Sequence, residues 1–284
     1  MEHSAAVDGF QLAYERTGSG PAVVLLHGWP GDHTDYDDVV PLLAPTREVI
    51  VPDLRGFGAS DKHDRDPAQQ YSADAQARSV LGLIEELGLD RPVLGGYDIG
   101  SRIAQTVART RPDLVRAIVV SPPLPGIGQR ILAPGVQRQF WYQSFHQLQL
   151  AEELIDGNPT AVRAYLRHFW SHWSGPDFTP AEDRLDHLTS VYAEPGGFTA
   201  SIGWYRAGAG AVARSLAERV PAPADRLAVP TTVLWPEYDP LFTRDWADRV
   251  GEFFADIRMT FVDGIGHYVP VESPADFAAA ALAA

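Results

Sequence analysis

The sequence predicts an α/β fold, in which helices cover both faces of a mostly parallel sheet and a helical segment is inserted late in the sheet. Three observations predict this fold. Short, continuously apolar runs recur along the chain, as in strands that are buried on both faces. In the first half they alternate with segments of helical periodicity. From about residue 127 to 215 the chain is helical and aromatic-rich, and then the strands return.

The first half of the chain provides most of the expected sheet. Residues 9–15 alternate between polar and apolar positions, which is typical of an exposed antiparallel strand. Ser72 is placed to cap a helix that ends just before Gly88. Residues 101–108 show the periodicity of a second helix. The buried strands are expected at residues 22–26, 49–51, 92–95, 117–120, 231–235 and 259–262.

Prolines mark both ends of the helical insertion. They stand at positions 122, 123 and 125, and again at 221, 223 and 230. We therefore predict an α/β core of residues 1–124 and 216–284, with a helical cap, or lid, of residues 125–215. A chain of 284 residues is long enough for one large domain with such an insertion.

Composition excludes several functional classes. The net charge of −14 argues against nucleic acid and anionic membranes as partners. The chain has no cysteine, so disulfides and thiolate chemistry are excluded. No apolar run approaches the length that crosses a bilayer, and no signal peptide is recognisable at the N-terminus. We expect a cytoplasmic protein that uses no metal and no cofactor, since its histidines lack a metal-ligand spacing.

The segment Gly96–Gly100 has the form of a nucleophile elbow, G-x-S-x-G, with Asp98 in the position of the serine. It joins an expected buried strand to an expected helix, which is the context that an elbow requires. A carboxylate in this position is a covalent nucleophile that forms an ester with a substrate carbon. Epoxides and alkyl halides suit this chemistry, whereas peptides and phosphates do not. The alternative is a glycine-rich turn with an aspartate N-cap.

Two later segments provide a base and an acid that could serve this nucleophile. Asp239 follows an apolar strand, and His267 lies in the loop after the next strand. The carboxyl ends of parallel strands meet at one edge of a sheet, where such folds place their ligands. The order Asp98, Asp239, His267 is similar to the nucleophile–acid–histidine order of α/β-hydrolases. Taken alone, Asp239 could be a turn residue and His267 a surface histidine, but the chain order favours a catalytic set.

The segment His27–Pro30 resembles the H-G-x-P oxyanion segment of α/β-hydrolases. The backbone N–H groups of Trp29 and Ile99 would stabilise the oxyanion that forms when water attacks the ester. His27 itself is interpreted as structural, because His267 fills the role of the base.

Across almost its whole length, the chain resembles the epoxide hydrolases of the α/β-hydrolase superfamily, and in particular the bacterial epichlorohydrin-type enzymes. The resemblance rests on His27–Pro30, Asp53–Ser60, the Asp98 elbow, Asp239 and Gly266–Pro270. In that family two cap tyrosines bind the epoxide oxygen and protonate it. The matching Trp-Tyr dipeptides imply that Tyr142 and Tyr205 take this role here; alternatively, they line an aromatic core.

The resemblance implies hydrolysis of a small apolar epoxide by water to a vicinal diol, through an ester on Asp98. We expect the protein to be a monomer or a homodimer. The alternatives are a haloalkane or haloacid dehalogenase with the same nucleophile, and a ligand-binding protein of this fold with weak turnover. Arg102 matches one arginine of the haloacetate dehalogenase pattern, but Ile99 replaces the other. The expected substrate pocket is formed by Trp29, Ile99, Trp141, Phe145 and Trp204.

Overall fold

A computed structural model describes residues 1–284, and its centre is one eight-stranded sheet. The strand order is β1-β2-β4-β3-β5-β6-β7-β8; β1–β2 and β2–β4 pair antiparallel and all other neighbours pair parallel. This confirms the mostly parallel sheet. The strands are β1 (Glu2–His3), β2 (Ala13–Gly18), β3 (Ala22–Leu26), β4 (Glu48–Pro52), β5 (Val93–Gly96), β6 (Ala117–Val120), β7 (Thr231–Pro236) and β8 (Ile257–Val262).

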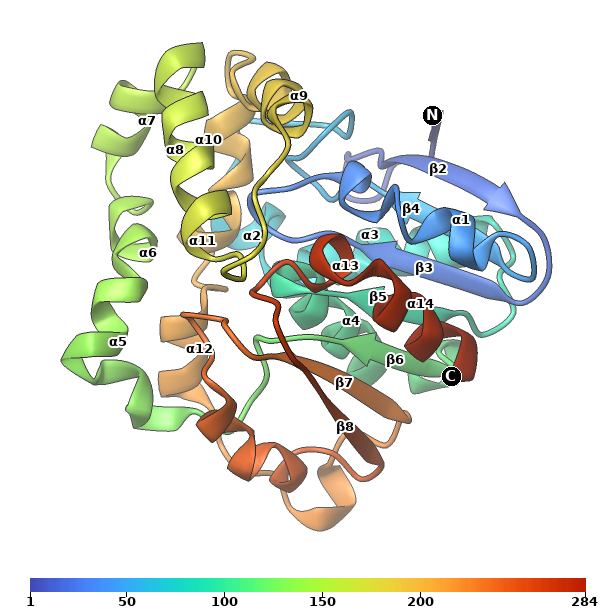
Figure 1. Ribbon diagram of the computed structural model, residues 1–284. Helices are drawn as coiled ribbons and strands as arrows, with labels where there is room; N and C mark the ends of the chain where they lie inside the picture. The colour runs from blue at the N-terminus through green and yellow to red at the C-terminus, as the bar shows by residue number, and fades with distance from the viewer.

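The central strands are continuously apolar because helices cover both of their faces. Every residue of β3, β5 and β6 is buried. Figure 1 shows α1, α13 and α14 on one face of the sheet, and α3 and α4 on the other. These helices are α1 (Val40–Leu43), α3 (Ala73–Glu86), α4 (Asp98–Thr110), α13 (Val269–Glu272) and α14 (Pro274–Ala283). Short helical turns complete the core: η1 (His33–Tyr36), α2 (Pro67–Gln70), η2 (Pro112–Leu114), η4 (Pro223–Asp225) and η5 (Arg244–Glu252).

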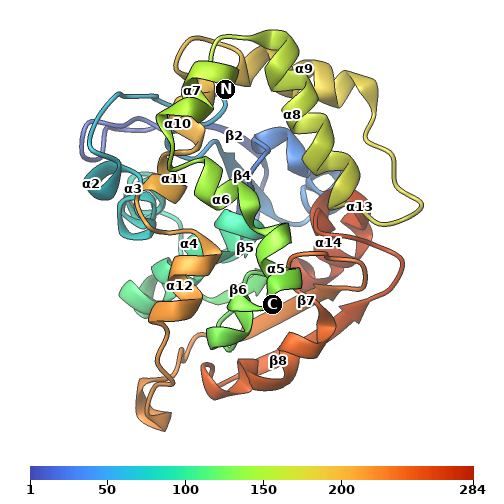
Figure 2. The same cartoon turned by 90° about the vertical axis from the view of Figure 1, so that its left-hand side faces the viewer.

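The segment between β6 and β7 contains helices and no strand, as the sequence predicts. Its helices stand together beside the sheet, beyond the carboxyl ends of the parallel strands (Figures 1 and 2). The predicted boundary at residue 124/125 precedes the first of them, whereas the boundary at 215/216 falls inside α12. The helices are η3 (Gly128–Leu132), α5 (Pro134–Gln139), α6 (Trp141–Phe145), α7 (Gln149–Ile155), α8 (Pro159–His172), α9 (Glu182–Tyr192), α10 (Gly197–Ser201), α11 (Gly203–Arg206) and α12 (Ala211–Ala217).

Local signals place most elements correctly, with one displacement near the N-terminus. The Ser72 side chain caps α3 by accepting a hydrogen bond from the Ala75 N–H at 3.2 Å, and Gly88 has the positive φ of +61° that ends this helix region. The antiparallel strand expected at residues 9–15 instead runs from Ala13 to Gly18. Phe10 lies outside it because its ring is fully buried against Tyr71 and His63. No helix is both long and apolar enough to cross a membrane.

Candidate active site at the carboxyl edge of the sheet

Asp98 begins α4 in a tight turn after β5, with a positive φ of +49° that is rare for a residue other than glycine. The two glycines of the elbow make this turn sterically possible. A Cβ on Gly100 would lie 2.0 Å from the carbonyl oxygen of Leu26, and one on Gly96 would lie 2.6 Å from the Gly100 backbone. The helix therefore packs directly on the strands and holds the Asp98 carboxylate at the sheet edge.

The structure brings Asp98, Asp239 and His267 together. Nε2 of His267 lies 3.2 Å from Oδ2 of Asp98, and its Nδ1 lies 2.8 Å from Oδ2 of Asp239. All three residues are at most 5% exposed. The other oxygen of Asp239 accepts hydrogen bonds from the N–H groups of Leu241 and Phe242, at 2.8 and 3.2 Å. The three residues thus form one chain of hydrogen bonds, and Asp239 orients the imidazole.

His267 is positively charged at neutral pH in this arrangement. Burial lowers the pKa of an imidazole, but the charges and hydrogen bonds of Asp239 and Asp98 outweigh it and raise the pKa of His267 to about 10. Any change that removes the charge of Asp98 would lower this pKa and favour the neutral imidazole, which is the form that can accept a proton.

The loop after β3 contacts the same carboxylate from the other side. The backbone N–H of Trp29 donates to Oδ1 of Asp98 at 2.9 Å. Ile99 is the second residue of α4, where backbone N–H groups have no partner within the helix. A Cβ on Gly28 would lie 2.8 Å from the Asp98 side chain, so only glycine allows this approach. His27 is fully buried and its Nε2 accepts from the Leu54 N–H at 3.0 Å, which gives it a structural role.

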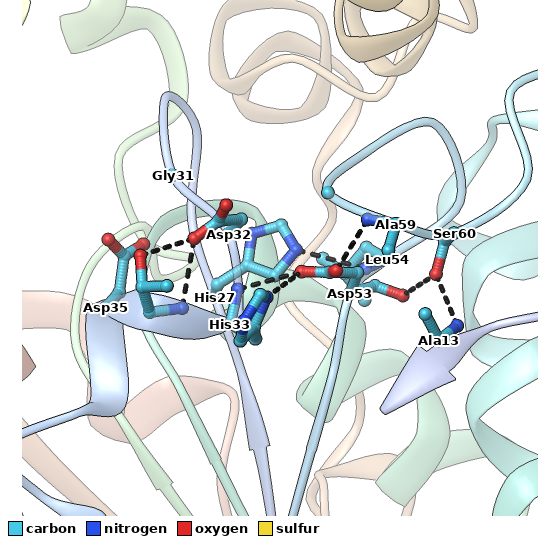
Figure 3. Close-up of polar contacts among 12 residues, drawn as sticks. Ala13, His27, Gly31, Asp32, His33, Asp35, Asp53, Leu54, Ala59 and Ser60 are labelled. Atoms are coloured by element: carbon cyan, nitrogen blue, oxygen red, sulfur yellow. Dashed lines mark hydrogen bonds and ion pairs between the residues drawn. The ribbon is translucent and has the colours of Figure 1, made fainter. Parts of the chain in front are cut away.

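A buried charge network supports this loop (Figure 3). Oδ1 of Asp53 accepts from both the backbone N–H and Nδ1 of His33, each at 2.9 Å, while its Oδ2 accepts from the Ala59 N–H at 2.8 Å. Asp32, His33 and Asp53 offer potential metal ligands within 4.8 Å of one another. The carboxylates, however, are already hydrogen-bonded: Asp32 accepts from Thr34 and lies 2.7 Å from His187. These contacts fit a loop anchor better than a metal site.

Two cap tyrosines and Asp98 line the same tight cavity, which leaves only about 10 Å³ of free space. Tyr142 from α6 and Tyr205 from α11 both line it, and their rings meet edge to face with centroids 5.5 Å apart. The Trp29 ring stacks in parallel with that of Tyr142 at 5.6 Å. The packing therefore fixes the tyrosine rings between the loop after β3 and the helices of the cap.

Both tyrosines remain protonated at neutral pH and can act as hydrogen-bond donors. Burial raises the pKa of Tyr142 and of Tyr205 well above the ordinary range, and the charge of Asp98 adds to the effect. Tyr142 accepts a hydrogen bond from Nε2 of Gln143 at 3.1 Å. The hydroxyl of Tyr205 is buried beside that of Tyr142, but the two do not meet with good hydrogen-bond geometry. The cavity thus contains a buried donor without a well-formed hydrogen bond.

Only some of the predicted pocket residues line this cavity. Ile99 and Trp204 do, whereas Trp29 lies behind the Tyr142 ring. Trp141 is 42% exposed, and its ring packs on Phe145, so the structure does not bring these two residues to the cavity. The reason is helical geometry, since successive residues of α6 project in different directions and Tyr142 takes the inward one.

Sequence reasoning missed several residues that line the cavity. One is Gln143, which follows Tyr142 directly. Another is Phe242, which lies three residues after Asp239 in the loop that follows β7. Gln143 stands in a short helix without clear periodicity, so no sequence pattern identified it. The remaining unpredicted lining residues are Arg102, Pro123, Ala209 and Ala211.

Comparison with known proteins agrees with this geometry. Residues 21–274 match the family described as alpha/beta hydrolase fold. A soluble epoxide hydrolase from Corynebacterium sp. (strain C12) is 30% identical over 280 residues, covering 96% of this chain and 92% of that protein. A fluoroacetate dehalogenase from Burkholderia sp. is 31% identical over 195 residues, covering 67% and 64% of the two chains.

A solved structure has the same architecture over nearly the whole chain. The epoxide hydrolase CorEH superposes with a TM-score of 0.85 at 27% identity, covering 99% of this chain and 97% of the other. The predicted resemblance to epoxide hydrolases is therefore confirmed. The chain belongs to the α/β-hydrolase fold family, as a hydrolase similar to the epoxide hydrolases within it.

Proposed function

We propose that the protein hydrolyses a small apolar epoxide to a vicinal diol through a covalent ester on Asp98. The observation that carries the proposal is the meeting of two sets of groups at one cavity. On the core side stands a carboxylate with a base beside it, and on the cap side stand two neutral tyrosine hydroxyls. An epoxide needs a nucleophile at carbon and a proton donor at oxygen, and these arrive from opposite sides.

In the first half-reaction Oδ2 of Asp98 attacks an epoxide carbon. Oδ1 is held by the Trp29 N–H and becomes the carbonyl oxygen of the ester. The carbon–oxygen bond of the ring breaks as the new bond forms. The ring oxygen takes a proton from Tyr142 or Tyr205, because an alkoxide is a poor leaving group near neutral pH.

The second half-reaction cleaves the ester with water. Esterification removes the negative charge of Asp98, which is one of the influences that raise the pKa of His267. The imidazolium then gives up its proton, which replaces the one that the tyrosine lost, and the neutral imidazole accepts a proton from the attacking water. The N–H groups of Trp29 and Ile99 stabilise the oxyanion. When the intermediate collapses, the bond between Cγ and Oδ2 of Asp98 breaks and His267 returns its proton to Oδ2, which leaves with the diol. Asp98 keeps one oxygen from water and passes the remaining proton of that water to His267.

This origin of the oxygen atoms gives the decisive experiment. With enzyme in excess over a panel of small epoxides in oxygen-18 water, the diol of the first turnover should carry no label. The peptide containing Asp98 should gain one solvent oxygen. A labelled first diol with unlabelled Asp98 would show direct attack by water. The same samples without substrate control for slow exchange of the carboxylate.

A dehalogenase is the second candidate, since the fluoroacetate dehalogenase relative shares much of the chain and Arg102 lines the cavity. A halide leaves as a stable anion and needs no proton, so the tyrosine pair favours the epoxide. Halide release from haloalkanes and haloacids, without diol formation from any epoxide, would favour the dehalogenase. Binding of epoxides without either product would indicate a ligand-binding protein.

A further inference from the structure

Gln143 connects Tyr142 to the far side of the cap. Its side chain is only 8% exposed and lines the Asp98 cavity. Its Oε1 accepts a hydrogen bond from the backbone N–H of Val212 at 3.2 Å, and its Nε2 donates to the Tyr142 hydroxyl oxygen at 3.1 Å. One amide therefore links α6 to the first turn of α12 and to the proposed proton donor.

The chemistry of the two partners fixes the orientation of this amide. A backbone N–H can only donate, so the amide oxygen must face Val212. The NH₂ group must then face Tyr142. Gly210 allows the amide to pack this closely, since a Cβ there would lie 2.7 Å from Oε1 of Gln143. The Gln143 amide is thus a donor, and not an acceptor, towards the tyrosine.

This orientation restricts the Tyr142 proton. A hydroxyl has one hydrogen, and the Tyr142 oxygen already accepts from Gln143, so its own hydrogen must point elsewhere. The cavity shared with Tyr205 and Asp98 is the open direction. An ionised tyrosine oxygen would also be stabilised by the Gln143 donor, because a hydrogen bond to an ionised acceptor is strengthened.

We propose that Gln143 is a positioning residue, which aims the Tyr142 hydroxyl at the epoxide oxygen and stabilises the tyrosine oxygen as its proton leaves. The proposal rests on the proposed epoxide hydrolysis. It adds one requirement to that reaction, which is that Gln143 must donate the hydrogen bond to Tyr142 and not accept it.

Reversal of this hydrogen bond is the test. Gln143→Glu keeps an acceptor for the Val212 N–H, but an ionised carboxylate would also accept from Tyr142 and draw its hydrogen away from the cavity. Gln143→Met removes both contacts. If Gln143 only links α6 to α12, Gln143→Glu should be the milder change. If it positions Tyr142, Gln143→Glu should slow ring opening at least as much as Gln143→Met at a pH where the new carboxyl group is ionised, by about tenfold to a hundredfold.

Ring opening is followed by rapid quench and mass spectrometry of the ester on the Asp98 peptide. A carboxyl group that stays protonated can still donate to Tyr142, and burial favours that form. The Gln143→Glu enzyme should therefore lose ring-opening rate as the pH rises, with a titration that wild type lacks. Its saturating rate should fall while the substrate concentration for half-saturation stays near that of wild type.

A double-mutant cycle with Tyr142→Phe is the matched control. Without the hydroxyl there is nothing to position, so Gln143→Glu should cause little further slowing in that background. Equal slowing in both backgrounds would overturn the proposal, and so would a mild Gln143→Glu with a flat pH profile. If the wild-type enzyme forms neither ester nor diol, both the proposed function and this inference are wrong. If the wild-type enzyme forms the ester normally and the cycle still shows no coupling, only the role of Gln143 is wrong.

Discussion

On the core side of the cavity, each carboxylate oxygen and ring nitrogen of Asp98, Asp239 and His267 has a hydrogen-bond partner. On the cap side, the Tyr205 hydroxyl makes no well-formed hydrogen bond, and Tyr142 accepts one from Gln143. Both sides are buried to a similar degree. The two sides therefore differ in hydrogen bonding and not in exposure.

This difference in hydrogen bonding matches the roles proposed for the two sides of the cavity. A fully bonded set of groups has its geometry fixed before substrate arrives, which suits a nucleophile and its base. A buried donor without an acceptor costs about 1–3 kcal/mol. It persists where a ligand supplies the acceptor, and an epoxide oxygen is an acceptor of this kind. The nucleophile, the base and the acid are thus fixed without substrate, while the cap donors are completed by it.

The largest expected effect is on the core side, in the His267→Gln variant. Ring opening needs no base, so the ester should still form on Asp98. Its hydrolysis should slow by about 10²–10⁴-fold, because no group accepts the proton of the attacking water. Mass spectrometry should find the adduct on the Asp98 peptide, with about one epoxide consumed per enzyme and almost no diol released. Asp98→Asn is the control that should form no adduct, and sustained turnover by His267→Gln would remove it from the role of base.

On the cap side, removing the Tyr205 hydroxyl should reduce activity without reducing the stability of the fold. Tyr205→Phe removes one donor to the epoxide oxygen, and ring opening should slow by about tenfold to a hundredfold. The same change removes a buried hydroxyl that lacks a partner, so the free energy of unfolding should stay level or rise. Urea denaturation together with single-turnover rates measures both. A clear loss of stability at an unchanged rate would identify Tyr205 as a packing residue.

The charge network under the oxyanion loop predicts how stability depends on pH. Burial lowers the pKa of His33, but the hydrogen bond and charge of Asp53 raise it from 6.5 to about 9. Because the folded pKa is the higher one, the stabilisation is fully present below about pH 6.5 and is lost as the pH rises through about 9. It amounts to at most about 3 kcal/mol.

His33→Gln keeps a neutral donor for Asp53 but cannot become charged. Its thermal unfolding temperature should therefore fall furthest below that of wild type in mildly acidic buffer, and the gap should narrow above about pH 9. A gap that is constant with pH would mean that His33 stabilises the loop through packing alone. This measurement tests whether the core side is held by charge, in contrast to the aromatic packing of the cap.

The same contrast explains what the sequence could predict. The core elements follow from continuous apolar runs, and Asp98, Asp239 and His267 each stand just after one of them, so chain order brings them together. The cap helices that contribute to the cavity are short: α6 has five residues and α11 has four. Periodicity in so few residues cannot show which side chain faces inward. Tyr142 and Tyr205 were therefore found through family resemblance, and Gln143 was missed.

The smallest expected effect on activity is at Trp141, the tryptophan of the first Trp-Tyr dipeptide in the cap. Trp141 and Trp204 each precede a tyrosine in the sequence, yet Trp204 is 2% exposed and lines the cavity. Trp141 is 42% exposed, and its ring packs on Phe145 of α6 and on the buried Phe169 of α8. Trp141→Ala should change the rate of epoxide turnover by no more than about threefold, equivalent to less than about 1 kcal/mol.

Trp204→Leu is the matched comparison, because it changes the cavity wall next to Tyr205 and should alter which epoxides are accepted. Relative kcat/KM values over a series of epoxides of increasing size measure this directly. Trp204→Leu should change the ranking of the epoxides by kcat/KM, since the volume it removes lies beside the proposed substrate. Trp141→Ala should change kcat/KM by the same factor for every epoxide. If Trp141→Ala changes the order instead, the cap must rearrange when substrate binds and turn the outer face of α6 towards Asp98.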